Sequence, residues 1–246
     1  MTTPELEGSA PAGGFCPTQW SVVLEARRDS RHRREALERL CRTYWLPVYG
    51  YLRRRGHAAP DAEDLTQGFF AHLLGSDFLE RPDPARGRFR GYLIGALRHY
   101  LGSHFEHENA QRRGGRAQFL DWSELDAETE FAALDQPQRD PSEVYETGWA
   151  LALVGRAMER LAAEQGTPAK ARQFAVLRPF LSTAAASGGY EQAALALGTT
   201  RTNVAVWVHR LNHRYGELVK LEVAATVQNP AEVKHEMQHL LQALRR

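Results

Sequence analysis

Lysine, cysteine and long apolar runs are all scarce in this chain of 246 residues. Lysine occurs only at Lys170, Lys220 and Lys234, so the basic residues are almost all arginine and their distribution is more informative than the net charge of +1. Cys16 and Cys41 form no CxxC pair, which argues against a disulfide framework and against a cysteine zinc site. Since no stretch of about 18 consecutive apolar residues occurs, no membrane span is expected.

The remaining composition is typical of a protein that folds around a core. Hydrophobic residues make up 43% of the chain, enough to exclude disorder throughout. Residues 1–15, rich in Gly, Pro, Ala and Glu, predict a flexible tail. Glu5 and Glu7 stand where a secretory signal needs positive charge. We therefore expect a cytoplasmic protein in a reducing compartment.

Charge is distributed very unevenly along the chain. Residues 86–116 contain seven arginines against two glutamates, a local net charge of +5. Residues 121–146 contain nine acidic residues against Arg139, a local net charge of -8. The first segment is suited to nucleic-acid phosphates, whereas the second repels them.

Apolar spacing predicts three helices in the first half. An amphipathic pattern covers residues 33–55, where Pro47 should introduce a kink. A second helix is expected over residues 61–74, and a third has its apolar residues between Phe89 and Leu101. Three successive helices without a β-alternating run predict an all-α bundle.

Glycine, proline and acidic residues between positions 114 and 146 indicate an extended linker, after which helices resume near Thr147. A further helix is expected within residues 168–186. The fold prediction is thus all-α, with two helical domains, an acidic linker and a C-terminal helical extension. The expected boundaries are 1–15 for the tail, 16–114 for the first domain, 115–146 for the linker, 147–227 for the second domain and 228–246 for the extension.

Residues 190–215 have the pattern of a helix-turn-helix. Gly198 supplies the turn and Thr200 can cap the second helix, whose Val204, Val208 and Leu211 face inward. The exposed end would then carry base-reading side chains, with phosphate-binding side chains further along. These are Arg201, Thr202 and Asn203 for bases, and His209, Arg210 and Arg214 for phosphates. An αα-hairpin that only packs is the alternative.

The sequence DAEDLTQGFFAHLL at 61–74 resembles the second conserved region of sigma-70 family initiation factors of the small, extracytoplasmic-function type. In that family this acidic helix docks on the clamp coiled coil of the largest RNA polymerase subunit. The resemblance implies Asp61, Glu63, Asp64 and Gln67 as contacts with the core polymerase. Acidic residues that only complement the helix dipole are the alternative explanation.

Residues 89–113 resemble the family's helix that melts and reads the -10 promoter element, and they coincide with the basic segment. Capturing single-stranded bases requires stacking surfaces beside a phosphate-binding face. This chain departs from the family at Glu106, His107 and Glu108, where arginine and lysine are usual. The implied contacts are Tyr92, Arg98, His99, Ser103, His104, Asn109, Arg112 and Arg113.

The helix-turn-helix is similar to the family's fourth region, which reads the -35 element. The resemblance therefore implies a non-enzymatic factor, without cofactor or metal, whose partners are core RNA polymerase, promoter DNA and an anti-sigma factor or other regulator. The acidic linker would mimic RNA in a positively charged channel or serve as a solvated spacer. A helix-turn-helix regulator that acts without binding polymerase is the alternative function.

His235, Glu236 and His239 match HExxH, the pattern of zinc peptidases in which two histidines bind the metal and the glutamate activates water. A catalytic zinc needs a third protein ligand, and no His, Asp, Glu or Cys follows His239. We therefore expect two solvent-facing histidines on an amphipathic helix. His104 and His107 are likewise expected on a polar helix face.

Overall fold

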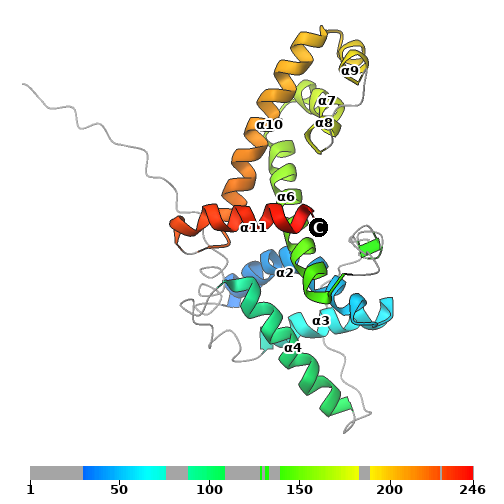
Figure 1. Ribbon diagram of the computed structural model, residues 1–246, viewed down its shortest axis with the longest axis vertical. Helices are drawn as coiled ribbons and strands as arrows, with labels where there is room; N and C mark the ends of the chain where they lie inside the picture. The colour runs from blue at the N-terminus through cyan, green and yellow to red at the C-terminus, as the bar shows by residue number, and fades with distance from the viewer. Residues whose placement is uncertain are drawn as a thin grey trace, which may run out of the picture.

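A computed structural model describes residues 30–75, 88–108, 128, 131–132, 139–182, 189–227 and 229–245 (Figure 1). Within these residues the fold is helical without any β-strand, as the apolar spacing predicted. None of the described helices combines the length and the apolar character needed to cross a membrane. The helices are α2 (Ser30–Arg54), α3 (Ala59–Gly75), α4 (Phe89–Glu108), α6 (Pro141–Ala163), α7 (Pro168–Leu177), α8 (Pro179–Ser182), α9 (Gly189–Leu197), α10 (Arg201–Ala224), the 3-10 helix η3 (Pro230–Glu232) and α11 (Val233–Arg245).

The first three helices share an aromatic core. The ring of Tyr44 on α2 meets that of Phe89 on α4 edge-on, with centroids 5.4 Å apart. Trp45 on α2 stacks on Phe70 of α3 at 6.1 Å. Such aromatic pairs stabilise a fold beyond the apolar area that they bury. All three predicted helices form, and their ends differ from the expected ones by a few residues.

Helix α6 joins this core to the second half of the chain. Its first half packs on α2 through the buried residues Val144, Tyr145 and Trp149, while Leu161 near its end is also buried in the same core. Gly148 allows the close approach, because a Cβ at this position would lie 3.1 Å from Cα of Pro47 on α2. One buried cluster therefore includes side chains of α2, α3, α4, α6, α10 and α11.

Helix α6 begins at Pro141, six residues before the helix start that was expected near Thr147. Asp140 caps the helix by accepting a hydrogen bond from the Ser142 N–H at 2.8 Å, and Glu143 completes a capping box. Proline is favoured at the first position of a helix. The local sequence thus starts the helix one and a half turns before the apolar pattern becomes obvious.

Two described residues inside the expected linker also pack on α2. Phe131 is buried, and its ring lies edge-on to Tyr49 with centroids 6.1 Å apart. Glu128 accepts hydrogen bonds from Arg53 Nε at 3.1 Å and from Arg53 Nη2 at 2.7 Å. These two positions are therefore helical and not extended, although Glu128 stays exposed to solvent. Most of the remaining linker lies outside the described residues, as does the expected tail.

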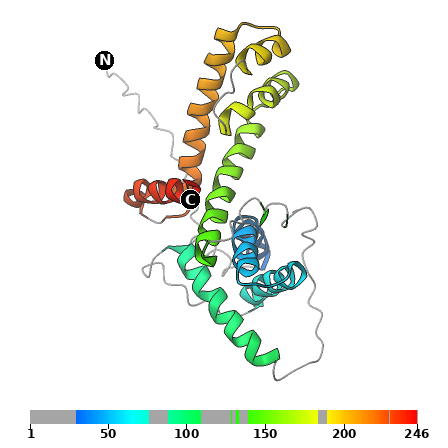
Figure 2. The same cartoon turned by 45° about the vertical axis from the view of Figure 1, so that its right-hand side comes forward.

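Helices α7 to α10 form the end of the molecule opposite to α3 and α4 (Figures 1 and 2). The helix expected over residues 168–186 is divided at Arg178, because Pro179 lacks the N–H that would continue α7. Gly198 has a φ of 61° and turns the chain between α9 and α10, while Thr200 caps α10. A second, smaller cluster packs these helices together; its buried residues are Leu177, Ala193, Ala194, Val204 and Val208.

Helix α11 lies across α6 and α10 (Figure 1). Leu240 and Ala243 are buried against the larger cluster, and the Thr147 hydroxyl on α6 donates to the Ala243 carbonyl at 3.2 Å. The C-terminal extension therefore packs on the core around α6.

Candidate nucleic-acid and partner-binding surfaces

The first turn of α10 is exposed at one end of the molecule. Arg201, Thr202 and Asn203 all face solvent there, because Val204 and Val208 occupy the buried side of the helix. Arg201 Nε lies 2.7 Å from Oε1 of Glu191 on α9, and the Arg201 side chain is still 70% exposed. An exposed ion pair of this kind is weak, so Arg201 can exchange Glu191 for another acceptor at small cost.

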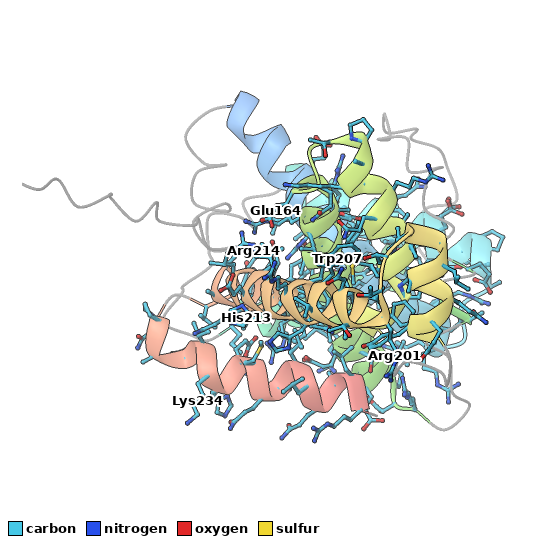
Figure 3. The ribbon with its side chains drawn as sticks, turned by 90° about the horizontal axis from the view of Figure 1, so that it is seen from above. Glu164, Arg201, Trp207, His213, Arg214 and Lys234 are labelled. Atoms are coloured by element: carbon cyan, nitrogen blue, oxygen red, sulfur yellow. The ribbon has the colours of Figure 1, made fainter. Side chains whose placement is uncertain are left out.

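Further along α10, the residues expected to bind phosphate differ from one another. His209 and Arg210 are exposed. Arg214 instead contacts Glu164 at the end of α6, and Figure 3 shows these two labelled side chains close together. Arg214 Nη2 donates to Glu164 Oε1 at 2.6 Å, Nε donates to Oε2 at 2.9 Å, and Nη1 donates to Glu217 at 2.8 Å. All three guanidinium nitrogens of Arg214 therefore serve contacts within the protein.

The acidic first turns of α3 form a second exposed surface. The carboxylates of Asp61, Glu63 and Asp64 face solvent, and Gln67 is partly buried. Within the described part of the chain none of the three carboxylates forms an ion pair. Phe69 and Leu73 on the opposite side of α3 are buried, so the surface is fixed in position by the core.

Only some of the α4 residues that were expected to contact DNA are exposed to solvent. Arg98 and His99 are exposed, whereas Tyr92, Ser103 and His104 are partly buried. Arg98 donates to Ser142 Oγ on α6 at 3.1 Å, and also to the Tyr51 hydroxyl on α2 at 3.3 Å. Arg98 thereby ties α4 to two neighbouring helices. The remaining expected residues, Asn109, Arg112 and Arg113, lie outside the described residues.

The sequence interpretation missed a charged cluster where α4, α6 and α11 meet. Arg90 on α4 pairs with Glu236 of α11, and its Nε lies 2.9 Å from Glu146 Oε2 on α6. The guanidinium carbon of Arg90 lies 4.3 Å from the ring centroid of the buried Trp149. Burial lowers the pKa of Arg90, and the neighbouring carboxylate of Glu146 opposes this effect. Glu236 is completely buried, so each side of this ion pair depends on the other.

Arg88 and the two histidines of α11 surround this pair. Arg88 Nη1 lies 3.0 Å from Glu236 Oε2, and its Nη2 lies 2.7 Å from His235 Nδ1. His239 Nε2 lies 2.9 Å from Glu146 Oε2, and its ring lies 6.0 Å from that of Trp149. The expectation that both histidines face solvent is therefore wrong for His239, which is partly buried.

This geometry explains the HExxH pattern without a metal. Its glutamate is engaged by two arginines, so it is not available to activate water. Among the described residues, no group of three or more His, Cys, Asp or Glu side chains is placed to hold a metal ion. The arginines of the basic segment are visible in the sequence. Their spacing, however, does not indicate that Arg90 pairs with Glu236, which lies 146 positions away.

Comparison of the chain with protein-family models, with curated proteins and with solved structures finds no match.

Proposed function

We propose that this protein is a sigma-type transcription initiation factor that binds core RNA polymerase, recognises promoter DNA at two elements and promotes its melting. On this proposal the protein works in the cytoplasm and the polymerase carries out the chemistry. An anti-sigma factor or another regulator would control it.

One observation carries the proposal: a single chain has an exposed carboxylate surface on α3 and, at its other end, the exposed first turn of a helix-turn-helix. A duplex-binding regulator needs only the second of these surfaces. Exposed carboxylates on a helix anchored in the core are suited to a cationic protein surface, and they repel DNA. The basic segment that includes α4 then supplies the second nucleic-acid contact.

Binding to purified core polymerase tests the carboxylate surface. The double variant Asp61→Lys/Asp64→Lys should bind core at least about tenfold more weakly, because both attractions become repulsions. Its far-UV circular dichroism should stay unchanged, since both side chains are exposed. Glu159→Lys, a charge reversal at an exposed position of α6, is the matched control and should bind normally. Equal binding of all three proteins would reject the proposed contact.

Transcription from a genomic template library with core polymerase tests promoter recognition. Start sites should depend on the protein, and Arg201→Ala should change their order of preference by about 1–3 kcal/mol per specific contact. A uniform loss on every promoter would instead identify Arg201 as a phosphate contact. If the protein binds duplex DNA alone, but neither associates with core nor supports any start site, the alternative of an ordinary helix-turn-helix regulator replaces this proposal.

A further inference from the structure

We propose that α11 is an intramolecular clamp in which Glu236 occupies Arg88 and Arg90, a pair of guanidiniums that would otherwise bind nucleic-acid phosphates. This inference rests on the proposed function, because it concerns the basic segment that begins before α4. It assigns a phosphate-binding site and, at the same time, the group that blocks it.

The clamp combines buried charges with apolar contacts. Glu236 contacts both arginines and is completely buried, and the Arg90 side chain is only 6% exposed. His239 adds a contact with Glu146 on α6. The apolar part of the interface consists of the buried Leu240 and Ala243, with the partly buried Val233 and Met237 packed against the same cluster.

A contact of this composition is suited to release. Desolvation offsets much of the attraction in a buried ion pair, so the pair adds little net stability while the helix is docked. When α11 leaves, Glu236 and Arg88 return to solvent and Arg90 keeps the Glu146 carboxylate on α6 as its partner, so no charge stays buried without one. The chain from Ala225 to Glu232, which contains the short helix η3, connects α11 to α10 and would serve as the tether.

Phosphates and Glu236 compete for the same donors. Both are anions that accept hydrogen bonds from guanidinium groups, so a phosphate that takes the nitrogens held by Glu236 displaces this carboxylate. The two equilibria are therefore linked: nucleic acid bound at the start of α4 should release α11, and a docked α11 should weaken nucleic-acid binding by the same factor.

Fluorescence anisotropy with a labelled DNA duplex that carries a single-stranded tract tests the clamp. Glu236→Gln keeps the side-chain shape and removes the charge, so it should bind the DNA more tightly than the wild type. Each phosphate contact adds roughly 0.7 to 0.9 to the slope of log affinity against log salt, so the slope should steepen by roughly 1.4 to 1.8. Adding Arg88→Ala to this variant should remove about half of the increase. Gln238→Ala, at an exposed position on the same helix, should match the wild type.

A binding curve for Glu236→Gln that coincides with the wild-type curve at every salt concentration overturns the clamp. Hydrogen exchange on the wild type decides the question if this variant proves misfolded. Adding the same DNA should then deprotect the amides of residues 233–245, and unchanged protection rejects the inference. Failure of the clamp alone leaves core binding by the wild type intact, whereas failure of the proposed function removes it.

Discussion

Arg214 on α10 and Glu164 at the end of α6 form a two-pronged ion pair, with nitrogen-to-oxygen distances of 2.6 and 2.9 Å. The hydrogen bonds from Arg214 lower the pKa of Glu164, and those to Glu164 and Glu217 raise the pKa of Arg214. The pair lies at one end of the contact between the antiparallel helices α6 and α10. Arg160 and Arg156 extend this contact by pairing with Glu222 on α10.

Replacing either partner of this pair should lower the thermal unfolding temperature, because Glu164→Gln removes the charge and one of the two acceptors, and Arg214→Ala removes every donor. The double variant Glu164→Gln/Arg214→Ala should unfold close to the more affected single variant, since coupled residues are not additive. Calorimetry on the three proteins measures this. Arg210→Ala, one turn earlier on the exposed side, is the control and should melt like the wild type. Fully additive losses would show that the two side chains act independently.

Because of this pair, the loss of thermal stability in Glu164→Gln should depend on pH. The folded pKa of Glu164 lies below its usual value of 4.5, so its stabilisation is fully present above that value and is lost as the pH falls through the lowered pKa. The difference in melting temperature between wild type and Glu164→Gln should thus be constant near about pH 7 and shrink towards about pH 3. A difference that grows on acidification would contradict this assignment.

The close contact between α2 and α6 predicts opposite effects for two glycines of α6. Gly148→Ala should destabilise the protein by about 1–3 kcal/mol, because the new methyl group would meet the backbone of Pro47. Gly155→Ala meets no atom within 4 Å, so it should stabilise the protein by up to about 1 kcal/mol. Urea unfolding of both variants measures the two free energies. Equal values would mean that α6 does not approach α2 so closely.

The turn between α9 and α10 permits a similar comparison. A Cβ at Gly198 has open space around it, so Gly198→Ala tests only the positive φ and should cost about 1–2 kcal/mol. Gly216→Ala, inside α10 and also in open space, should instead stabilise the protein by up to about 1 kcal/mol. Denaturant titration distinguishes the two. An unchanged free energy of unfolding in Gly198→Ala would argue against the left-handed turn.

Cys41 should be inert in the folded protein. Burial raises the pKa of its thiol to about 12, and the neighbouring Glu38 contributes in the same direction. In a Cys16→Ser background, a thiol-specific reagent at mildly alkaline pH should react with Cys41 at least about a thousandfold more slowly than after denaturation, because the thiolate is so scarce. Absorbance of the released chromophore gives both rates. Rapid labelling of the native protein would place Cys41 outside the core.

The helices could be predicted because their causes are local. The apolar spacing of α3 and α4, the cap at Thr200 and the turn at Gly198 each depend on residues within a few positions of one another. The start of α6 was also encoded locally, in Asp140 and Glu143, but the acidic composition of the surrounding segment obscured it. The exposed carboxylates on α3 and the exposed first turn of α10 follow directly from these helices.

The sequence by itself determined that the chain is helical and where its charges lie along each helix, because periodicity and capping are properties of neighbouring residues. Only the tertiary structure decided which charges face each other. Arg90 and Glu236 are 146 positions apart, and Glu164 and Arg214 are 50 apart. Such pairs depend on how α6, α10 and α11 pack around a shared core, and no local spacing specifies that packing. Two arginines of α10 therefore have different roles: Arg210 is exposed to solvent, whereas Arg214 contacts Glu164 at the end of α6.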